Sequence, residues 1–185
     1  MANWDKLNSE MDSVLESMTS EDWLQLKNKN NMAKFKSTKL FDGYSACFRQ
    51  WRAEGTHCRF LHGYAVSFRV WFEGELDHRN WVFDFGGMKR AKTTIGGMSP
   101  KEFFAHMLDH TTIVAKDDPY LETFEKMDED GIIQLRVMDS VGCEQFAKYL
   151  YTVINTFLNV ETEGRVKAVK VEVYEHERNS ASYEE

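Results

Sequence analysis

Residues 60–74, FLHGYAVSFRVWFEG, decide the fold of this chain. Bulky side chains recur at every second position from His62 to Phe72, and the small or charged residues Gly63, Ala65, Ser67 and Arg69 lie between the first of them. Because successive side chains of a strand point to opposite faces of a sheet, this alternation predicts a long strand with one buried face. The predicted buried set is His62, Tyr64, Val66, Phe68, Val70 and Phe72.

Other strands are predicted on both sides of this stretch. Residues 34–49 alternate around Asp42-Gly43, which predicts a long strand with a bulge or bend, and the loop 50–59 follows. Residues 81–85, 131–138 and 166–175 are predicted to be further strands. In the last of these, the period of two places Val169, Val171 and Val173 on the buried face.

Two helices are predicted between the strands. Ser99 as N-cap, Pro100 at the first helical position and Glu102 completing a capping box mark the start of one helix. Its inner stripe is predicted to be Phe103, Phe104, Met107 and Leu108. Residues 141–159 repeat apolar side chains at helical spacing. Helices that cover one face of an antiparallel sheet predict an α+β protein.

Composition excludes several classes of protein. The 185 residues carry a net charge of −7, from 23 basic and 30 acidic side chains, which argues against sequence-independent nucleic-acid binding. No apolar run approaches the roughly 20 residues that cross a bilayer. Three cysteines are an odd and sparse set, which favours a reducing cytoplasm over a disulfide framework. A cytoplasmic protein without a membrane partner is expected.

The chain divides near residue 33. Residues 1–33 have a narrow apolar stripe at helical spacing and end in an Asn-rich linker, so we predict an N-terminal helical extension. This extension is expected to dock on the main body or on a neighbouring subunit. Residues 34–185 form the main domain.

Glu175 is the first candidate for a functional side chain. The period of two places it on the face of the buried valines, at the end of its strand. A carboxylate there is costly unless it meets water or a partner. It is therefore either solvated or accepts hydrogen bonds from a ligand that has adjacent N–H donors.

Two further pairs could carry chemistry. Cys58 and His62 are a Cys-x3-His pair, whose alternatives are a metal site, an activated thiolate or no function. Asp109 and His110 follow the first helix, where a carboxylate can orient an imidazole and raise its basicity, although such neighbours also occur by chance. Glu144 either joins a helix-start network or is a first-turn acid.

Six motifs occur in an order that identifies a family. They are YSACFR at 44–49, CRFLHGY at 58–64, DFGGMK at 84–89, LDH at 108–110, VGCE at 141–144 and VEVYE at 171–175. Together they resemble the family of 6-pyruvoyltetrahydropterin synthase and 6-carboxytetrahydropterin synthase over about 34–185. The short spacing from Cys58 to His62 is similar to that of the bacterial carboxy-forming, queuosine-pathway branch.

The resemblance implies a tunnelling fold. This fold has a four-stranded antiparallel sheet with two helices on one face, and its subunits join into a barrel, usually a homohexamer of two trimers with sites at the interfaces. In such an enzyme Cys58 would be the proton-abstracting thiolate, with Asp109 and His110 as a second acid–base pair. Glu175 would anchor a pterin ring, with Cys143 and Glu144 at the matching substrate-binding motif.

The metal site departs from the family pattern. The family holds zinc through three histidines, and His62 alone matches them here, because Phe48 and Tyr64 stand at the other two positions. A register shift of one residue would offer Cys47 as a ligand instead of Phe48, so the candidate ligands are His62 with Cys47 or Tyr64. A catalytic zinc usually has three protein ligands, so the resemblance implies at most a degenerate zinc site.

Three functions follow from these residues. The leading hypothesis is a 6-carboxytetrahydropterin synthase-like lyase that acts on dihydroneopterin triphosphate, in 7-deazaguanine or pterin biosynthesis. The alternative is a metal-free homologue that binds a pterin or purine-like ring and has lost or changed the synthase chemistry. The third is a structural oligomer or partner-binding protein, for which residues 1–33 are the positive indication.

Overall fold

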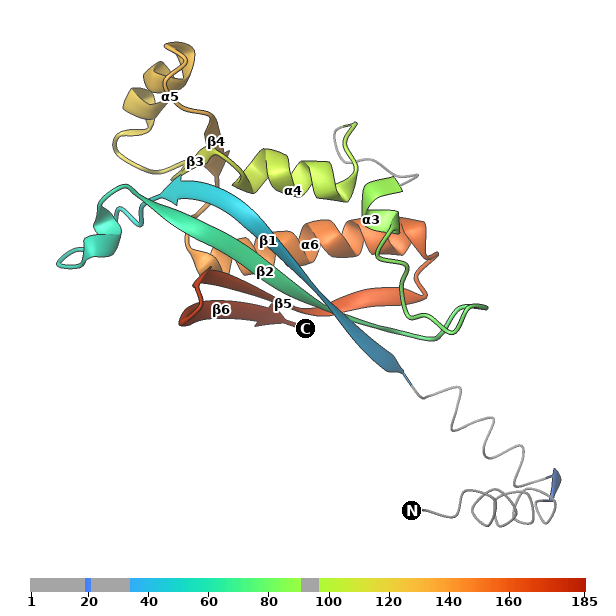
Figure 1. The fold of residues 1–185 in the computed structure, drawn as a ribbon. Helices are drawn as coiled ribbons and strands as arrows, with labels where there is room; N and C mark the ends of the chain where they lie inside the picture. The colour runs from blue at the N-terminus through green and yellow to red at the C-terminus, as the bar shows by residue number, and fades with distance from the viewer. Residues whose placement is uncertain (1–18, 21–33, 91–96) are drawn as a thin grey trace, which may run out of the picture. The chain divides into compact units, whose positions relative to one another are not determined.

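The computed structural model describes residues 19–20, 34–90 and 97–185 (Figure 1). The chain splits into two units, Met1–Lys34 and Phe35–Glu185, and the fold below is that of the second. Apart from residues 19 and 20, the helical extension predicted for residues 1–33 lies outside the described residues.

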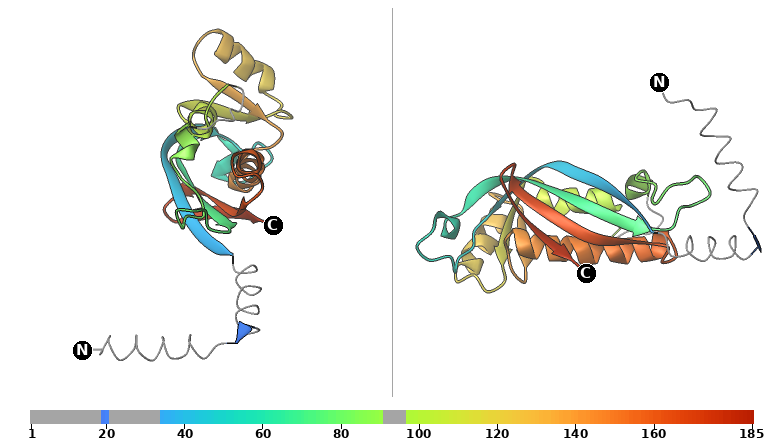
Figure 2. Two further views of the ribbon diagram at one scale, coloured as in Figure 1. Left: turned by 90° about the vertical axis from the view of Figure 1, so that its right-hand side faces the viewer. Right: turned by 90° about the horizontal axis from the view of Figure 1, so that it is seen from below.

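One sheet of six strands forms the second unit, in the order β4-β3-β1-β2-β5-β6 (Figures 1 and 2). Antiparallel pairing joins β1 (Phe35–Phe48), β2 (His62–Gly74), β5 (Val166–His176) and β6 (Asn179–Glu184). The sequence predicts β1, β2 and β5 as strands, whereas β6 is not among the predicted strands. Two short parallel strands, β3 (Thr111–Ala115) and β4 (Leu135–Met138), extend the sheet beside the end of β1 and make it mixed.

Two helices cover one face of this sheet. They are α4 (Pro100–Leu108) and α6 (Cys143–Glu161). The predicted capping box is confirmed, because Ser99 accepts from the Glu102 backbone and Glu102 accepts from the Ser99 backbone. Shorter helical segments are η1 (His57–Arg59), α3 (Gly87–Arg90) and α5 (Leu121–Glu129). None of the described helices has the length and hydropathy that a membrane span requires.

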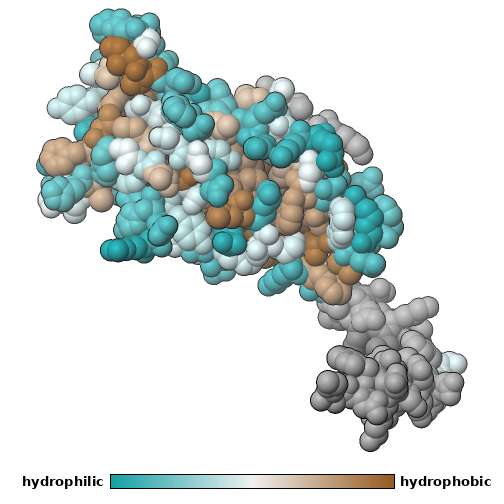
Figure 3. All heavy atoms as spheres, in the orientation of Figure 1, coloured by the Kyte–Doolittle hydropathy of each residue, from teal (hydrophilic) through white to brown (hydrophobic). Residues whose placement is uncertain are grey.

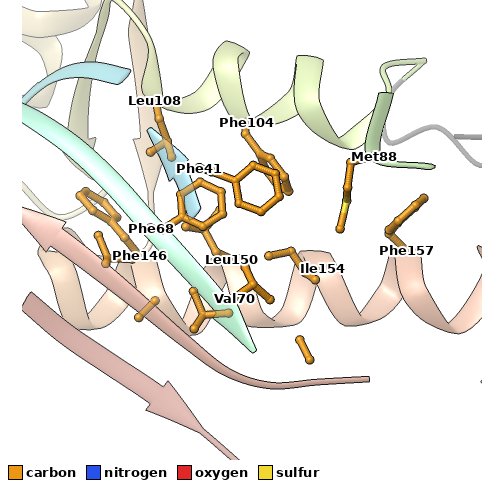
Figure 4. Packing of buried hydrophobic residues seen from close by; sticks show 14 of the residues in the cluster. Phe41, Phe68, Val70, Met88, Phe104, Leu108, Phe146, Leu150, Ile154 and Phe157 are labelled. Carbon is orange, nitrogen blue, oxygen red and sulfur yellow. The ribbon is translucent and has the colours of Figure 1, made fainter. Parts of the chain in front are cut away.

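The core between sheet and helices is rich in aromatic rings (Figure 4). Phe41 of β1 stacks on Phe68 of β2 at 4.8 Å between ring centroids, and Phe104 of α4 meets both rings edge-on. From α6, Phe146, Leu150 and Ile154 point into the same layer. The predicted buried face of β2 is confirmed from Val66 to Phe72, because burial there alternates with a period of two.

The bulge predicted in the first strand is present. The register of β1 against β2 shifts between Phe41 and Tyr44, around Gly43 with a φ of 84°. Beyond it Tyr44, Ala46 and Phe48 face the core, so Cys47 lies on the opposite face, across from Gly63. This register places Phe48 directly across from His62.

The strand predicted at 81–85 is wrong. Val82 and Phe83 are buried, but they lie in an irregular segment between β2 and α3. The Arg165 guanidinium holds this segment, donating to the carbonyl oxygens of Glu75 and Val82. An arginine distant in sequence thus supplies the hydrogen bonds that a strand neighbour would give, which local alternation cannot reveal.

The buried position predicted for Val169 is also wrong. A register shift lets Trp71 pair with Lys170 and Phe72 with Ala168, so Val169 is an extra residue and Ala168 takes the buried position. The Asn155 side chain of α6 stabilises this bulge. Its amide accepts from Ala168 N at 2.9 Å and donates to Ala168 O at 3.0 Å.

A buried ion pair attaches the α5 end of the unit to β1. The Arg49 guanidinium donates to both carboxylate oxygens of Asp118, at 2.8 and 2.5 Å, and the Asp118 side chain is 1% exposed. The same guanidinium lies 5.2 Å from the Tyr120 ring centroid. Apolar side chains are exposed near this end, among them Ile132 and Val137 (Figure 3). The ion pair joins the loop before α5 to the residue that follows β1.

Candidate functional site

A cavity of about 170 Å³ lies where the start of α6, the ends of β1 and β5 and the start of β2 meet. It is smaller than the roughly 300–1,000 Å³ typical of drug-sized ligands, so it suits one small heterocycle. Its lining is Phe48, Gln50, Cys58, Tyr64, Cys143, Glu144, Glu175, Asn179, Ser180 and Ala181. Four of the residues predicted from the sequence, Cys58, Cys143, Glu144 and Glu175, therefore share one cavity.

Glu175 reaches the cavity through a second bulge in β5. The pairing of β5 with β6 shifts between Tyr174 and His176, which leaves Glu175 as the unpaired residue. A bulge redirects a side chain, and here the carboxylate lines the cavity. The Asn179 amide donates a long hydrogen bond, 3.5 Å, to this carboxylate, and the Tyr64 phenol, which lines the same cavity, interacts with it. Glu175 is therefore a partnered carboxylate at the cavity wall.

Tyr64 forms the aromatic wall of the cavity. Its ring stacks on Phe48 with centroids 4.1 Å apart and planes 15° apart, and it contacts the His62 ring at 4.4 Å. Burial raises the pKa of the Tyr64 phenol, and the charge of Glu175 raises it further. The hydroxyl therefore stays protonated at physiological pH and acts as a donor.

The first residues of α6 close the other side. Burial raises the pKa of the Cys143 thiol to about 12, and the negative charges of Glu175 and Glu144 act in the same direction. Cys143 is therefore a neutral thiol near neutral pH. Cys58 approaches from η1, whose loop is tied to the end of β1 by a 2.8 Å bond from Gln50 N to Cys58 O.

Gly142 allows α6 to begin at the cavity. Its φ of 123° and ψ of 158° belong to a region that only glycine adopts without strain, and a Cβ there would collide with the Gln50 amide. We expect Gly142→Ala to lower the free energy of unfolding by about 1–3 kcal/mol in urea denaturation. Gly63→Ala, where an added Cβ meets nothing within 4 Å, is the control. An equal effect of the two substitutions would contradict this account.

Asp109 and His110 are not among the residues that line this cavity. Asp109 follows α4 and accepts from Ser45 N at 3.2 Å, and His110 Nδ1 lies 2.9 Å from Asp109 Oδ1. The His110 side chain is 78% exposed, on a backbone with a φ of 56°. Neither residue lines the Glu175 cavity of its own chain. The two are paired as the sequence suggests, and their approach to a cavity stays a prediction.

The residues present do not fit a zinc ion. Phe48 offers no ligand atom, the Tyr64 phenol has a raised pKa and stays protonated, and Cys47 lies on the opposite face of the sheet from His62. His62 Nδ1 is 2.7 Å from the Phe60 carbonyl oxygen. Within residues 34–90 and 97–185, no three His, Cys, Asp or Glu side chains gather closely enough to hold a metal. We therefore assign no ligand set to zinc.

Sequence reasoning missed several lining residues. Gln50 comes from the loop after β1, while Asn179 and Ser180 come from the start of β6. Their signal was weak, because polar residues after a strand usually mark an ordinary turn. A closer look at the residues that follow Glu175 would have found Asn179, four positions on.

Comparisons with known proteins identify the family and the fold of this chain. The model of a family described as 6-pyruvoyl tetrahydropterin synthase matches residues 37–185. An uncharacterised protein of Wolinella succinogenes is similar in structure, with a TM-score of 0.67, 21% identity, and coverage of 82% of this chain and 98% of that one.

Two named enzymes share the fold as well. The 6-pyruvoyl tetrahydropterin synthase of Caenorhabditis elegans has a TM-score of 0.53 and 16% identity over 83% of this chain and 96% of its own. That of Plasmodium vivax has a TM-score of 0.55 and 13% identity over 82% and 98%. At these identities the likeness concerns the fold. A search of curated protein sequences finds no match.

Proposed function

The chain belongs to the 6-pyruvoyl tetrahydropterin synthase family, and we propose that its Glu175 cavity binds the bicyclic ring of a pterin. The observation that carries this proposal is the position of Glu175, a carboxylate that lines a small cavity beside an aromatic wall. A pterin presents a ring N–H and an amino group side by side. A carboxylate can accept from both, and such charge-assisted pairs combine strength with directional specificity.

The finer proposal is a synthase-type reaction on dihydroneopterin triphosphate, of the 6-carboxytetrahydropterin synthase kind. Cys58 is the cavity residue suited to take a proton from a side-chain carbon of the substrate. Triphosphate then leaves the neighbouring carbon with the electron pair of its C–O bond. The product would serve 7-deazaguanine or pterin biosynthesis in the cytoplasm.

An oligomer would complete this site. Asp109 and His110 do not line the cavity of their own chain, so their acid–base role requires a neighbouring subunit. Within the described residues, β6 ends the sheet on one side, and β3 covers only Ala46–Phe48 of β1, so long stretches of edge are open to pairing. Ring closure would remove these edges. We propose a homohexamer of two trimers.

A second candidate function is ring binding without turnover. The stacking of Phe48 on Tyr64 favours it, because these side chains provide aromatic surface and no ligand set for an electrophilic metal. In that case the Glu175 cavity would hold a pterin or purine-like ring, and dihydroneopterin triphosphate would be bound but left intact.

Cys58→Ala separates these two functions. If Cys58 takes the proton, we expect triphosphate release to fall roughly 10²–10⁴-fold, while the affinity for substrate changes little. Released triphosphate is measured by chromatography and affinity by titration calorimetry. Cys47→Ala is the matched control, because Cys47 lies on the opposite face of the sheet.

The outcomes differ clearly. Equal turnover by Cys58→Ala and the unaltered protein would contradict the role of Cys58. Binding without triphosphate release by the unaltered protein would select the second function. Failure to bind pterin or guanine derivatives at all would reject both.

A further inference from the structure

Positions 48, 62 and 64 converge on one face of two adjacent strands. Phe48 pairs with His62 across the β1–β2 ladder, and Tyr64 lies two residues further along β2 on the same face. The rings are in contact, with centroids 4.1 Å apart for Phe48 and Tyr64 and 4.4 Å apart for His62 and Tyr64. Three side chains at these positions therefore meet beside the cavity.

This aromatic group is anchored in the core. Phe48 is 3% exposed and meets Phe146 of α6 edge-on, at 5.0 Å between centroids. Its other contact is the face of the Tyr64 ring. An aromatic ring packed in this way has little rotamer freedom, so the Tyr64 hydroxyl has a defined direction.

Tyr64 shares its cavity with Glu175. The Tyr64 phenol and the Glu175 carboxylate line the same cavity and interact there, and the Asn179 amide donates a long hydrogen bond, 3.5 Å, to the carboxylate. A carboxylate has about four acceptor sites. One bond from Tyr64 orients the group and leaves acceptor sites for the two adjacent donors of a ring.

We propose that Tyr64, without any metal ion, positions Glu175 for the ligand, and that the Phe48–Tyr64 stack occupies the space between positions 48, 62 and 64 in which a metal would otherwise be held. The ligand part rests on the proposed function, whereas the metal part stands on these three positions alone. Tyr64 is a positioning residue, since it acts through Glu175. Fixing the carboxylate before binding saves the entropy of ordering it afterwards.

Zinc binding tests the proposal that the Phe48–Tyr64 stack occupies the place of a metal. We expect the full-length protein, dialysed against micromolar zinc and then against buffer, to retain far less than one zinc per chain by atomic absorption. We expect Phe48→His/Tyr64→His, which places imidazoles beside His62, to retain about one. Phe48→His alone is the control, and circular dichroism checks that each variant is folded.

Either of two results would overturn the proposal about the metal position. One is about one zinc per chain in the unaltered protein, which requires no variant to fold. The other is a folded double variant that retains no more zinc than the unaltered protein, because the stack would then not occupy a metal position.

Ligand selectivity tests the proposal that Tyr64 positions Glu175. Pterin and lumazine differ in that lumazine carries an oxygen in place of the 2-amino group, so it offers Glu175 fewer adjacent donors. We expect Tyr64→Phe to weaken pterin binding about tenfold, the value of one hydrogen bond to a charged group, and lumazine binding much less. Titration of the intrinsic fluorescence with each compound measures both.

The result distinguishes positioning from mere structure. An equal loss for both rings, or no loss for either, would overturn the positioning role. If the unaltered protein bound neither ring, the proposed function would fall and the positioning role with it, while the zinc measurements would still decide the metal part.

Discussion

Glu175→Gln is expected to weaken pterin binding at least about 100-fold. Glutamine keeps the size of the side chain but removes its charge and replaces one acceptor oxygen with a donor, which faces the N–H groups of the ring. Hydrogen bonds to a charged group contribute about 1.5–3 kcal/mol each, and two such bonds are at risk. Titration calorimetry with pterin and with dihydroneopterin triphosphate measures the change.

Glu172→Gln is the matched control for this experiment. Glu172 lies on the same strand, with the same charge, and pairs across the ladder with Arg69. It accepts from Ser180 Oγ at 2.7 Å, and although Ser180 lines the cavity, Glu172 itself does not. Its substitution should leave pterin affinity within about threefold. A similar loss in both variants would point to general electrostatics, and unchanged affinity of Glu175→Gln would remove the basis of the proposed function.

Arg49→Met is expected to give a large loss of stability. It leaves the Asp118 carboxylate, 1% exposed, without its cation, and breaking a buried pair in this way costs about 3–5 kcal/mol. For a chain of this length each kcal/mol lowers the melting temperature by about 2–4 °C, so the fall should be roughly 6–20 °C. Scanning calorimetry or thermal circular dichroism measures it.

Two further variants serve as comparisons for Arg49→Met. Arg52→Met removes an exposed pair, in which the Arg52 and Asp117 side chains are 71% and 44% exposed, and should cost less than about 1 kcal/mol. Arg49→Met/Asp118→Asn should recover part of the loss, because no unpaired charge remains buried. Equal effects of Arg49→Met and Arg52→Met would show that burial does not set the strength of the first pair.

The sequence predicted the parts of the fold that local patterns determine. Alternation along β2, the bulge at Gly43 and the capping box at Ser99 each depend on residues close together in the chain. Val82 and Val169 were misplaced because their positions depend on distant partners, Arg165 and Asn155. Strand β3 was not predicted, and the strand predicted at 131–138 begins only at Leu135. The parallel pairing of β3 with β4 joins segments about 20 residues apart, which no local pattern indicates.

The same difference between local patterns and distant partners decides which residues of the candidate site could be predicted. Glu175 was found by its position after two buried valines and by the family motif, although the bulge that redirects it was not foreseen. The Tyr64–Glu175 bond joins residues more than 100 positions apart, so no local pattern could indicate it. The structure also places Phe48 across from His62, a register that the sequence left open.

The Asn155 side chain has an effect beyond the bulge that it stabilises. It joins α6, which begins at Cys143, to β5, which carries Glu175 near its end. The two walls of the cavity therefore belong to one helix and one strand that this amide links, three turns of helix away from Cys143. In related chains, a substitution at such a distant link offers a way to widen or narrow the cavity. Every residue that touches the ligand stays unchanged in that case.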